Sequence, residues 1–401
     1  MERVVIIGGG LAAVSAAKTL RTEGFEGALT MVSEEPCLPY DRPPLSKAVL
    51  QGAADSQSIC LLTEEARQKL EIELRINSRA ETIDRVAQMV RLSTGDSLSY
   101  DRLLIATGSR ARILDGPFAG KANVFYLRTI ADAERLRAQM VPGRCLLSIG
   151  AGWIGLEVAA TARKGGMKAV VVELAQMLCG RSLPMEVGMA LGDVHRINGT
   201  EVYLNTSIRA VGGEGRVESV TLSNGETLAV DIVVIGIGAV ANDSLAEEAG
   251  LETDNGIVVD QFLRTTDPLI FAAGDVAAQR VDGGRPVRRE SWANAQDQAA
   301  AAARNMLGHD KLYSINTWFW SDQYDLNIQM IGVNPAEEGA MLLRKDEGRS
   351  FTRFSVVDER LAGAICFDRP REMAVIRRLI SKGYSVTDDA LTTVRDLREL
   401  L

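Results

Sequence analysis

The chain has few of the side chains from which catalytic and metal sites are most often built. It carries two histidines, His195 and His309, far apart in the sequence, and five cysteines with no C-x-x-C spacing and no close pair. A zinc site and a histidine-based catalytic triad therefore have little to draw on. The scattered cysteines likewise indicate neither a disulfide framework nor a dithiol redox centre.

An excess of positive charge and a long apolar run are also missing. The net charge of −8 argues against a protein that coats nucleic acid. No apolar run approaches the length that spans a bilayer, and the N-terminus, MERVVIIGGG, has no basic leader. We therefore expect a cytoplasmic protein without nucleic-acid or membrane partners. Its 46% hydrophobic and 24% charged residues are typical of a globular enzyme.

A glycine-rich fingerprint follows the first apolar run. The stretch VVIIGGGLAA contains Gly8-x-Gly10-x-x-Ala13, a helical pattern continues to Leu20, and a second strand pattern, ALTMVSE, ends in Glu34. Such glycines permit a tight turn and let the backbone approach a pyrophosphate at a helix N-terminus, while the acid binds a ribose hydroxyl. The pattern predicts a dinucleotide site.

The same pattern occurs a second time. The stretch CLLSIGAGWIGLE contains Gly150-x-Gly152-x-x-Gly155, a helical pattern follows, and the next strand pattern, KAVVVE, ends in Glu173. Two complete copies predict two dinucleotides, because two turns used only for packing would leave both terminal acids unexplained. Glu173 favours NADH, since a carboxylate accepts the 2′-hydroxyl of NADH and repels the 2′-phosphate of NADPH.

Further glycine turns define the domain organisation. LLIATGSRAR and IVVIGIGAVAN enclose the second copy, as expected where a chain leaves one nucleotide domain and returns to it. We predict an α/β fold with two Rossmann-like dinucleotide-binding domains, the second inserted into the first, plus a C-terminal α+β domain. The predicted boundaries are 1–108 with 240–319, then 109–239, then 320–401. The strand patterns FTRFSVVD and RLAGAICF and an amphipathic helix near REMAVIRRLISKG support the last domain.

Two shorter stretches carry polar groups that suit a cofactor. IFAAGDVA ends an apolar run in Gly274 and Asp275, whose carboxylate suits either a polyol chain or a helix cap. PYDRPPLSK places two adjacent prolines between Arg42 and Lys47. Prolines stiffen the backbone and supply no N–H donor, so this loop holds two cations with little conformational freedom.

Several of these motifs occur in the order typical of one family. The chain resembles the FAD-dependent, NADH-linked ferredoxin reductases of bacterial aromatic-ring dioxygenase and haem monooxygenase systems, within the glutathione reductase fold superfamily. The resemblance covers nearly the whole chain, with Ala13 replacing the third glycine and Asn316-Thr317 standing where the family often has Val-Pro. The matching motifs are GGGLAA, PYDRPPLSK, YDRLLIATGSRAR, GAGWIGLE, IFAAGDVA, RRESWANAQDQA and TWFWSDQYDLNIQMIG.

The resemblance implies a set of cofactor-binding residues and three catalytic ones. Lys47, Glu157 and Trp292 are the expected catalytic residues: Lys47 lies near the flavin and favours its anionic reduced form, and Glu157 orients the nicotinamide or Lys47. The remaining residues expected at FAD or NADH are Gly8, Gly10, Leu11, Ala12, Ala13, Glu34, Arg42, Ala80, Thr107, Gly108, Arg110, Arg128, Gly150, Gly152, Ile154, Gly155, Glu173, Gly238, Gly274, Asp275, Glu290 and Trp320.

More ordinary roles stay open for some of these side chains. Arg42 and Lys47 also suit a solvated loop rim, Arg128 also suits the start of an exposed helix, and at least one aromatic residue of the run 318–320 is expected to be plain core.

The resemblance implies that electrons pass from NADH through FAD to a [2Fe-2S] ferredoxin that feeds an oxygenase, in aromatic hydrocarbon catabolism. The protein is then a monomer or homodimer, and the arginine run 280–289 is the expected ferredoxin dock. One alternative is a flavin NADH oxidase or a peroxide or thiol reductase, but Pro43 and Pro44 stand where such enzymes place a redox cysteine. The other is a nucleic-acid-binding interaction protein on the same fold, against which the net charge argues.

Overall fold

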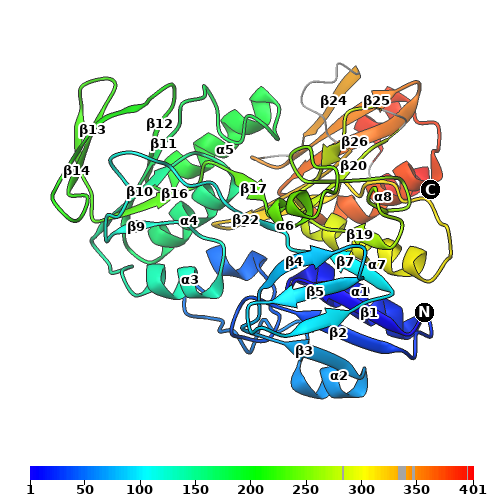
Figure 1. Cartoon of the computed structure of the whole chain (residues 1–401). Helices are drawn as coiled ribbons and strands as arrows, with labels where there is room; N and C mark the ends of the chain where they lie inside the picture. Colours follow the sequence, from blue (N-terminus) through cyan, green and yellow to red (C-terminus); the bar gives the residue numbers. More distant parts are fainter. Residues whose placement is uncertain (282–283, 333–339, 346–347, 395) are drawn as a thin grey trace. The chain divides into compact units, whose positions relative to one another are not determined.

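A computed structural model describes residues 1–281, 284–332, 340–345, 348–394 and 396–401. The chain forms two compact units. The first unit comprises Met1–Pro44, Ala54–Arg110 and Ala239–Asn316, and the second comprises Leu45–Ala53, Ala111–Gly238 and Thr317–Leu401. Figure 1 colours these segments along the sequence.

The first unit combines parallel and antiparallel strands with four helices among its described residues. Its elements are β1 (Arg3–Ile7), α1 (Leu11–Thr22), β2 (Ala28–Val32), α2 (Glu64–Lys69), β3 (Ile72–Arg75), β4 (Ala80–Asp84), β5 (Met89–Leu92), β6 (Ser97–Ser99), β7 (Arg102–Ile105), β8 (Ser109–Ala111), β17 (Ala239–Ala241), α6 (Ser244–Glu248), β18 (Ile257–Val259), β19 (Ile270–Ala272), β20 (Ala277–Gln279), β21 (Val287–Arg288) and α7 (Trp292–Met306). The 3-10 turn η1 (Pro43–Ser46) and β8 span the sequence boundary between the units.

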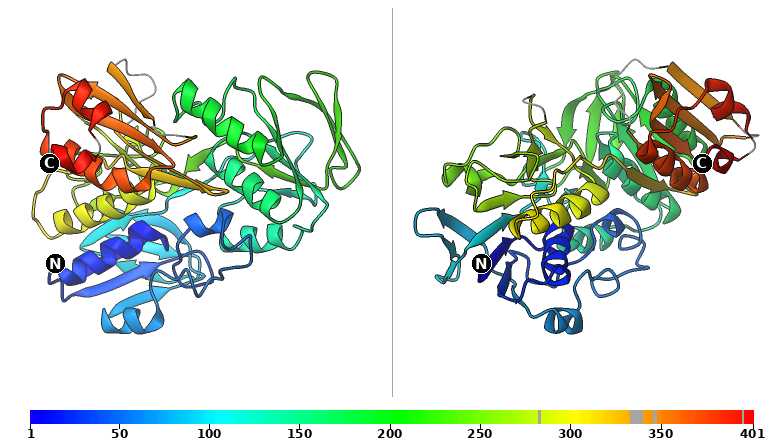
Figure 2. Two further views of the ribbon diagram at one scale, coloured as in Figure 1. Left: turned by 180° about the vertical axis from the view of Figure 1, so that it is seen from behind. Right: turned by 90° about the vertical axis from the view of Figure 1, so that its right-hand side faces the viewer.

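A parallel sheet in the order β19-β7-β1-β2-β3 forms the core of the first unit. Except for the edge strand β3, which carries Glu73 and Arg75, its strands are short, mostly apolar and mostly buried, as expected for a parallel sheet covered on both faces. Helices α1 and α7 pack side by side (Figure 2). Because β2 and β7 lie on opposite sides of β1, the strand order reverses there, and ligands bind at such a point beyond the carboxyl ends of the strands.

The second unit contains the other parallel sheet and the C-terminal sheet. Its described elements are β9 (Val124–Phe125), α3 (Ile130–Arg137), β10 (Cys145–Ile149), α4 (Trp153–Lys164), β11 (Lys168–Val172), α5 (Met185–Ile197), β12 (Thr200–Tyr203), β13 (Ile208–Gly212), β14 (Ser219–Leu222), β15 (Thr227–Ala229), β16 (Ile232–Ile235), β22 (Phe319–Gln323), β23 (Leu326–Ile331), β24 (Ala340–Lys345), β25 (Phe351–Val357), β26 (Arg360–Phe367), α8 (Pro370–Lys382), α9 (Asp388–Thr393) and the 3-10 helix η2 (Leu397–Leu400).

The parallel sheet of the second unit repeats the plan of the first. Its order is β12-β11-β10-β16-β9, so the strand order reverses at β10. Helix α4 packs on β10 and β11. The second glycine fingerprint therefore begins at the carboxyl end of β10, just as the first begins at the end of β1.

The C-terminal sheet is antiparallel in the order β22-β23-β26-β25-β24, and α8 packs on β23 and β26. The predicted strands FTRFSVVD and RLAGAICF are β25 and β26, and the predicted amphipathic helix is α8. The predicted α/β class with two Rossmann-like sheets and a C-terminal α+β portion is confirmed. The exact domain boundaries remain a prediction. Across the described helices, none combines the length and apolar character of a membrane span.

Candidate functional site

The first glycine fingerprint forms an open cradle at the end of β1. Gly8 has a φ of +142°, and a Cβ at this position would lie 2.2 Å from the carbonyl oxygen of Ala106. Gly10 is the N-cap of α1, and no described side chain caps this helix. The first N–H groups of α1 are therefore available to an anion. Leu11, Ala12 and Ala13 open the helix, and Ala13 is fully buried.

Arg42 supplies a cation beside this cradle. Its Nη2 lies 2.8 Å from Glu35, its guanidinium lies over the Tyr40 ring, and its Nη1 lies 3.5 Å from where a Cβ on Gly10 would stand. Its Nε is buried and has no hydrogen-bond partner in the described part of the chain. A phosphate at the start of α1 would supply that partner, so these residues fit the pyrophosphate of FAD. Glu34, the predicted ribose acid, follows β2 and is exposed.

Other predicted flavin residues lie where the chain leaves the first unit and returns to it. Thr107 Oγ1 donates to the carbonyl of Asn242 over 2.8 Å, and Arg110 donates to the carbonyl of Ala241 over 3.0 Å. Gly108, at φ +67°, lies between them in the sequence. The side chains of Thr107 and Arg110 thus hold the returning segment in place. Ala80 begins β4 and is half-buried.

Asp275 lies just beyond the carboxyl end of β19. Ser109 Oγ donates to its carboxylate over 3.1 Å, and the N–H of Gly274 donates to Gln298 over 2.8 Å. A carboxylate in this place suits the ribityl hydroxyls of FAD, because hydroxyl groups donate readily to an ionised acceptor.

Trp292 opens α7 and is tied to the proline loop. Its indole Nε1 donates to Asp41 over 2.9 Å. Glu290, two residues earlier, pairs with Arg288. The PYDRPPLSK motif and the RRESWANAQDQA motif therefore meet within the first unit through Asp41 and Trp292.

The second glycine fingerprint is as tightly built as the first. A Cβ on Gly155 would lie 2.5 Å from the carbonyl oxygen of Gly150, and Gly152 is the N-cap of α4 with no cap from a described side chain. The Glu173 carboxylate accepts from the N–H of Ala151 over 2.7 Å. The acid is thereby held beside the glycine turn, where the adenosine ribose of a dinucleotide is expected. Ile154 is 43% exposed.

A cation lies beside the other predicted glycine of this unit. Gly238 has a φ of +109°, and the Arg181 guanidinium lies 3.2 Å from where its Cβ would stand. Together with the open start of α4, these groups fit the pyrophosphate of NADH.

The Glu157 carboxylate is the centre of a buried polar cluster. Glu157 lies on α4 and is 4% exposed. Lys47 Nζ lies 2.9 Å from its Oε2, and Ser46 Oγ also donates to Oε2. Ser321 Oγ, from β22, donates to Oε1 over 2.6 Å. The predicted catalytic pair, Lys47 and Glu157, is thus brought together, and two serines with no predicted role, Ser46 and Ser321, complete the cluster.

A chain of buried polar groups continues beyond Ser321. Gln323 Nε2 donates to Ser321 Oγ over 3.1 Å, and Gln323 Oε1 lies 2.6 Å from Nε2 of His195. His195 is fully buried on α5, and its burial lowers its pKa to about 4. One feature of the sequence predicts that Ser321 and Gln323 lie together: their i, i+2 spacing, which places both side chains on one face of a strand.

Two further predicted residues lie in the second unit. Trp320 stacks on Trp318 with ring centroids 5.1 Å apart, and the guanidinium of Arg377 lies over the Trp318 ring. Arg128 precedes α3, whose start carries a capping box formed by Thr129 and Asp132. The expected flavin contacts of Arg128 and Trp320 remain predictions.

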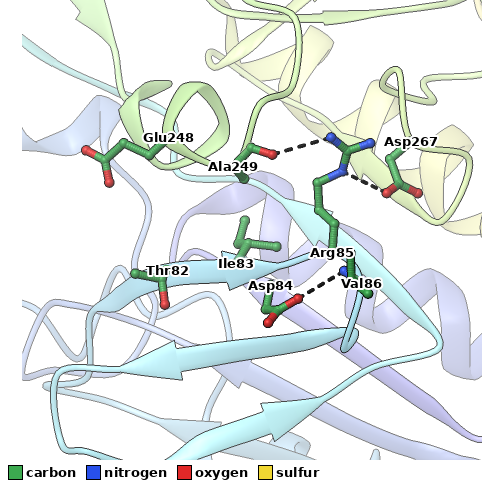
Figure 3. Close-up of a pocket in the computed structure, with 8 residues that line it drawn as sticks. All are labelled: Thr82, Ile83, Asp84, Arg85, Val86, Glu248, Ala249 and Asp267. Carbon is green, nitrogen blue, oxygen red and sulfur yellow. Dashed lines mark hydrogen bonds and ion pairs between the residues drawn. The ribbon is translucent and has the colours of Figure 1, made fainter.

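A pocket of about 790 Å³ lies elsewhere in the first unit (Figure 3). Arg85 spans it, with its guanidinium 3.0 Å from Asp267 and 3.4 Å from the carbonyl of Ala249. Its lining contains none of the predicted cofactor residues. The lining residues are Thr82, Ile83, Asp84, Arg85, Val86, Glu248, Ala249 and Asp267.

Comparison with known proteins agrees with the two cradles. Residues 2–299 match the pyridine nucleotide-disulphide oxidoreductase family, and residues 318–401 match the reductase C-terminal family. The chain belongs to the pyridine nucleotide-disulphide oxidoreductase family. The predicted enzyme class, with FAD and NAD(H) as cofactors, is confirmed by this membership.

Three similar proteins, all reductases, indicate more closely which members of this family the chain resembles. Rhodocoxin reductase of Rhodococcus erythropolis is 38% identical over 98% of this chain and 93% of that protein. The anthranilate 1,2-dioxygenase system ferredoxin–NAD(+) reductase component of Burkholderia cepacia is 42% identical over 94% of each. The reductase in the covalent putidaredoxin reductase–putidaredoxin complex is 35% identical, with a TM-score of 0.93 over 100% of this chain and 98% of that chain. The family resemblance expected from the sequence is confirmed.

Proposed function

We propose that this protein passes electrons from NADH through FAD to a [2Fe-2S] ferredoxin that feeds an oxygenase of aromatic hydrocarbon catabolism. The observation that carries the proposal is the pair of glycine cradles, each at the point where the strand order of a parallel sheet reverses. Two dinucleotides held by one chain suit a relay from a nicotinamide to a flavin. The relatives named for ferredoxin reduction support the choice of acceptor.

The bound flavin would supply the chemistry, because it accepts a hydride and releases electrons one at a time. The protein's residues bind and orient. Arg42 and the start of α1 hold the FAD pyrophosphate, Glu34 the ribose and Asp275 the ribityl chain. Gly150, Gly152 and the start of α4 hold the NADH pyrophosphate, and Glu173 holds its ribose.

Lys47, Glu157 and Trp292 act at the reacting end in this proposal. Lys47 would present a positive charge to the flavin, and Glu157 holds that cation by an ion pair of 2.9 Å. The indole of Trp292 is held by Asp41, and this side chain would pack near the flavin ring. We further propose that the protein is cytoplasmic and is a monomer or homodimer. Light scattering of the purified protein tests the oligomeric state.

A reconstituted assay tests the proposed function. We expect the purified protein to be yellow, to release FAD on denaturation and to reduce cytochrome c with NADH only when a [2Fe-2S] ferredoxin is added. NADPH should be at least tenfold poorer in kcat/KM, about 1.4 kcal/mol in transition-state binding. Release of FMN, or ferredoxin-independent hydrogen peroxide formation as the main activity, would contradict the proposal. A gel shift with duplex DNA at moderate salt tests the nucleic-acid alternative, and we expect none.

A further inference from the structure

We propose that Gln323 and His195 are positioning residues that fix the orientation of the Glu157 carboxylate through Ser321, and so fix Lys47. The inference rests on the proposed function for its kinetic consequences. It concerns four side chains from α4, α5 and β22, all within the second unit. Their hydrogen bonds run in sequence from the buried imidazole to the buried carboxylate.

The two oxygens of Glu157 have different partners. Oε2 meets Lys47 and Ser46, whereas Oε1 accepts from Ser321 over 2.6 Å. Loss of the Ser321 hydroxyl would leave a buried carboxylate oxygen without this donor, and the carboxylate could then rotate to satisfy it elsewhere. That rotation would move Oε2 relative to Lys47, whose side chain is 21% exposed and whose ammonium is held by this ion pair.

The chemistry of these groups fixes the direction of each hydrogen bond. A carboxylate paired with lysine only accepts, so the single hydroxyl proton of Ser321 points to Glu157. The Ser321 oxygen must then accept from Gln323, which requires the amide nitrogen on that side. The amide oxygen of Gln323 consequently faces His195, so Nε2 of His195 carries a proton and donates.

The environment of His195 agrees with a neutral ring in this tautomer. Its Nδ1 is buried and has no hydrogen-bond partner among the residues that the structure describes, as expected for the unprotonated nitrogen. The Tyr324 ring lies edge-on to the imidazole with centroids 5.2 Å apart, and burial lowers the pKa of His195 to about 4. In this series of hydrogen bonds every donor therefore points toward Glu157, and His195 forms the far end of the series.

The hydrogen-bond direction can be observed directly in the holoenzyme. The chain has two histidines, so side-chain ¹⁵N spectra of the protein labelled at histidine contain two sets of signals, and His309→Gln assigns them. We expect His195 to be neutral with its proton on Nε2 at pH 7. In Glu157→Gln the new amide can donate to Ser321, so we expect the His195 nitrogen shifts to change. A proton on Nδ1, an imidazolium at pH 7, or spectra unchanged in Glu157→Gln would overturn the proposal.

Single-turnover kinetics test the consequence for catalysis. In Ser321→Ala and Gln323→Leu we expect the rate of flavin reduction at saturating NADH to fall roughly tenfold, with less than about a twofold change in the NADH concentration at half-saturation. Ser321→Thr keeps the hydroxyl and should keep at least about half of the wild-type rate. Wild-type rates in both variants, or an equal loss in Ser321→Thr, would overturn the proposal.

A matched control separates positioning from lost stability. Asn123 is a buried amide of the same unit that bonds the backbone at Val217 and Asp231. We expect Asn123→Ala to lower Tm while leaving the rate of flavin reduction unchanged; a tenfold slower Asn123→Ala would count against positioning. If the wild-type protein holds no FAD or is not reduced by NADH, the proposed function fails, whereas the histidine spectra still decide the hydrogen-bond chain.

Discussion

At the residue scale, the cost of burying a titratable side chain is offset in different ways at Glu157 and His195, both in the second unit. The Glu157 carboxylate is matched by one cation and two hydroxyl donors. The His195 imidazole is matched by one amide oxygen, and its other nitrogen has no partner among the described residues. Because burial of an isolated charge is far costlier than burial of a neutral polar group, the carboxylate needs its partners, whereas the imidazole avoids the cost by staying neutral.

This difference predicts how stability depends on pH. The pKa of His195 is lowered from 6.5 to about 4 by burial, so the unfolded chain binds more protons than the folded chain between these values. Stability from the neutral imidazole is therefore complete above pH 6.5 and declines as the pH falls toward 4. The full difference is roughly 3 kcal/mol. We expect urea unfolding at pH 7 and pH 5 to show a smaller difference in His195→Gln than in the wild type.

The exposed His309 offers the control for that measurement. Replacement by glutamine there should leave the pH dependence of unfolding as in the wild type. If His195→Gln and His309→Gln behave alike, carboxylates rather than the buried imidazole govern stability in this range.

At the element scale, the ends of α8 show how far local sequence rules reach. Pro370 stands in the first turn of this helix, where its missing N–H costs nothing, and Gly383 follows its last residue with a φ of +63°. Both signals are local, so the helix near REMAVIRRLISKG could be predicted from the sequence. Both glycine fingerprints could be predicted for the same reason, because the turn, the helix start and the ribose acid of each lie within one short stretch of sequence.

The left-handed conformation at Gly383 predicts a stability change. A Cβ there would meet no atom closer than the Arg360 guanidinium at 3.9 Å, so the cost of Gly383→Ala is conformational rather than steric. We expect a loss of about 1 kcal/mol in the free energy of unfolding. Denaturant unfolding measures it.

Gly165 provides a matched position, because it is the C-cap of α4 with a φ of −79° that alanine adopts readily. Gly165→Ala should change the unfolding free energy by less than about 0.5 kcal/mol. An equal loss at both sites would show that the left-handed backbone is not the cause.

At the scale of the whole molecule, the surface charge bears on the ferredoxin partner. Small ferredoxins are generally acidic, and this chain has a net charge of −8, so attraction must come from a local patch. The arginine run 280–289 was the expected patch, with residues 282–283 outside the described part of the chain. Arg280 pairs with Glu252, and Arg288 is 9% exposed and donates to the carbonyl of Asp275. The side chain of Arg285 is 88% exposed, with its Nε 4.0 Å from Asp254, so we expect this arginine to attract the ferredoxin.

We expect Arg285→Glu to lower kcat/KM for ferredoxin about threefold at low salt, with the difference shrinking as salt rises. Reduction of the flavin by NADH should be unchanged. Steady-state kinetics across ionic strength measure both. Arg79→Glu, an exposed cation of the same unit, is the charge-matched control. Equal effects of the two substitutions would indicate a general charge effect and place the dock elsewhere.

The sequence could not reveal the surroundings of Glu157, because its partners come from distant parts of the chain. Ser46 and Lys47 precede it by more than a hundred residues, and Ser321 follows it by more than a hundred and fifty. No periodic pattern links such positions. The family resemblance suggested the Lys47–Glu157 pair, but Gln323 and His195 emerge only once β22 and α5 are packed in one unit.

The same contacts determine when, during synthesis, the second unit can finish folding. Residues 318–401 match a family of their own, yet Ser321 donates to Glu157, and the Tyr324 hydroxyl lies 2.6 Å from that of Thr200. During synthesis from the N-terminus, α4 leaves the ribosome well before β22 exists. Until β22 arrives, the inward-facing carboxylate has no serine donor on Oε1 and relies on water. The second unit therefore completes its polar interior only near the end of translation, and a chain cut short before residue 317 would expose that unfinished surface to the quality-control machinery of the cell.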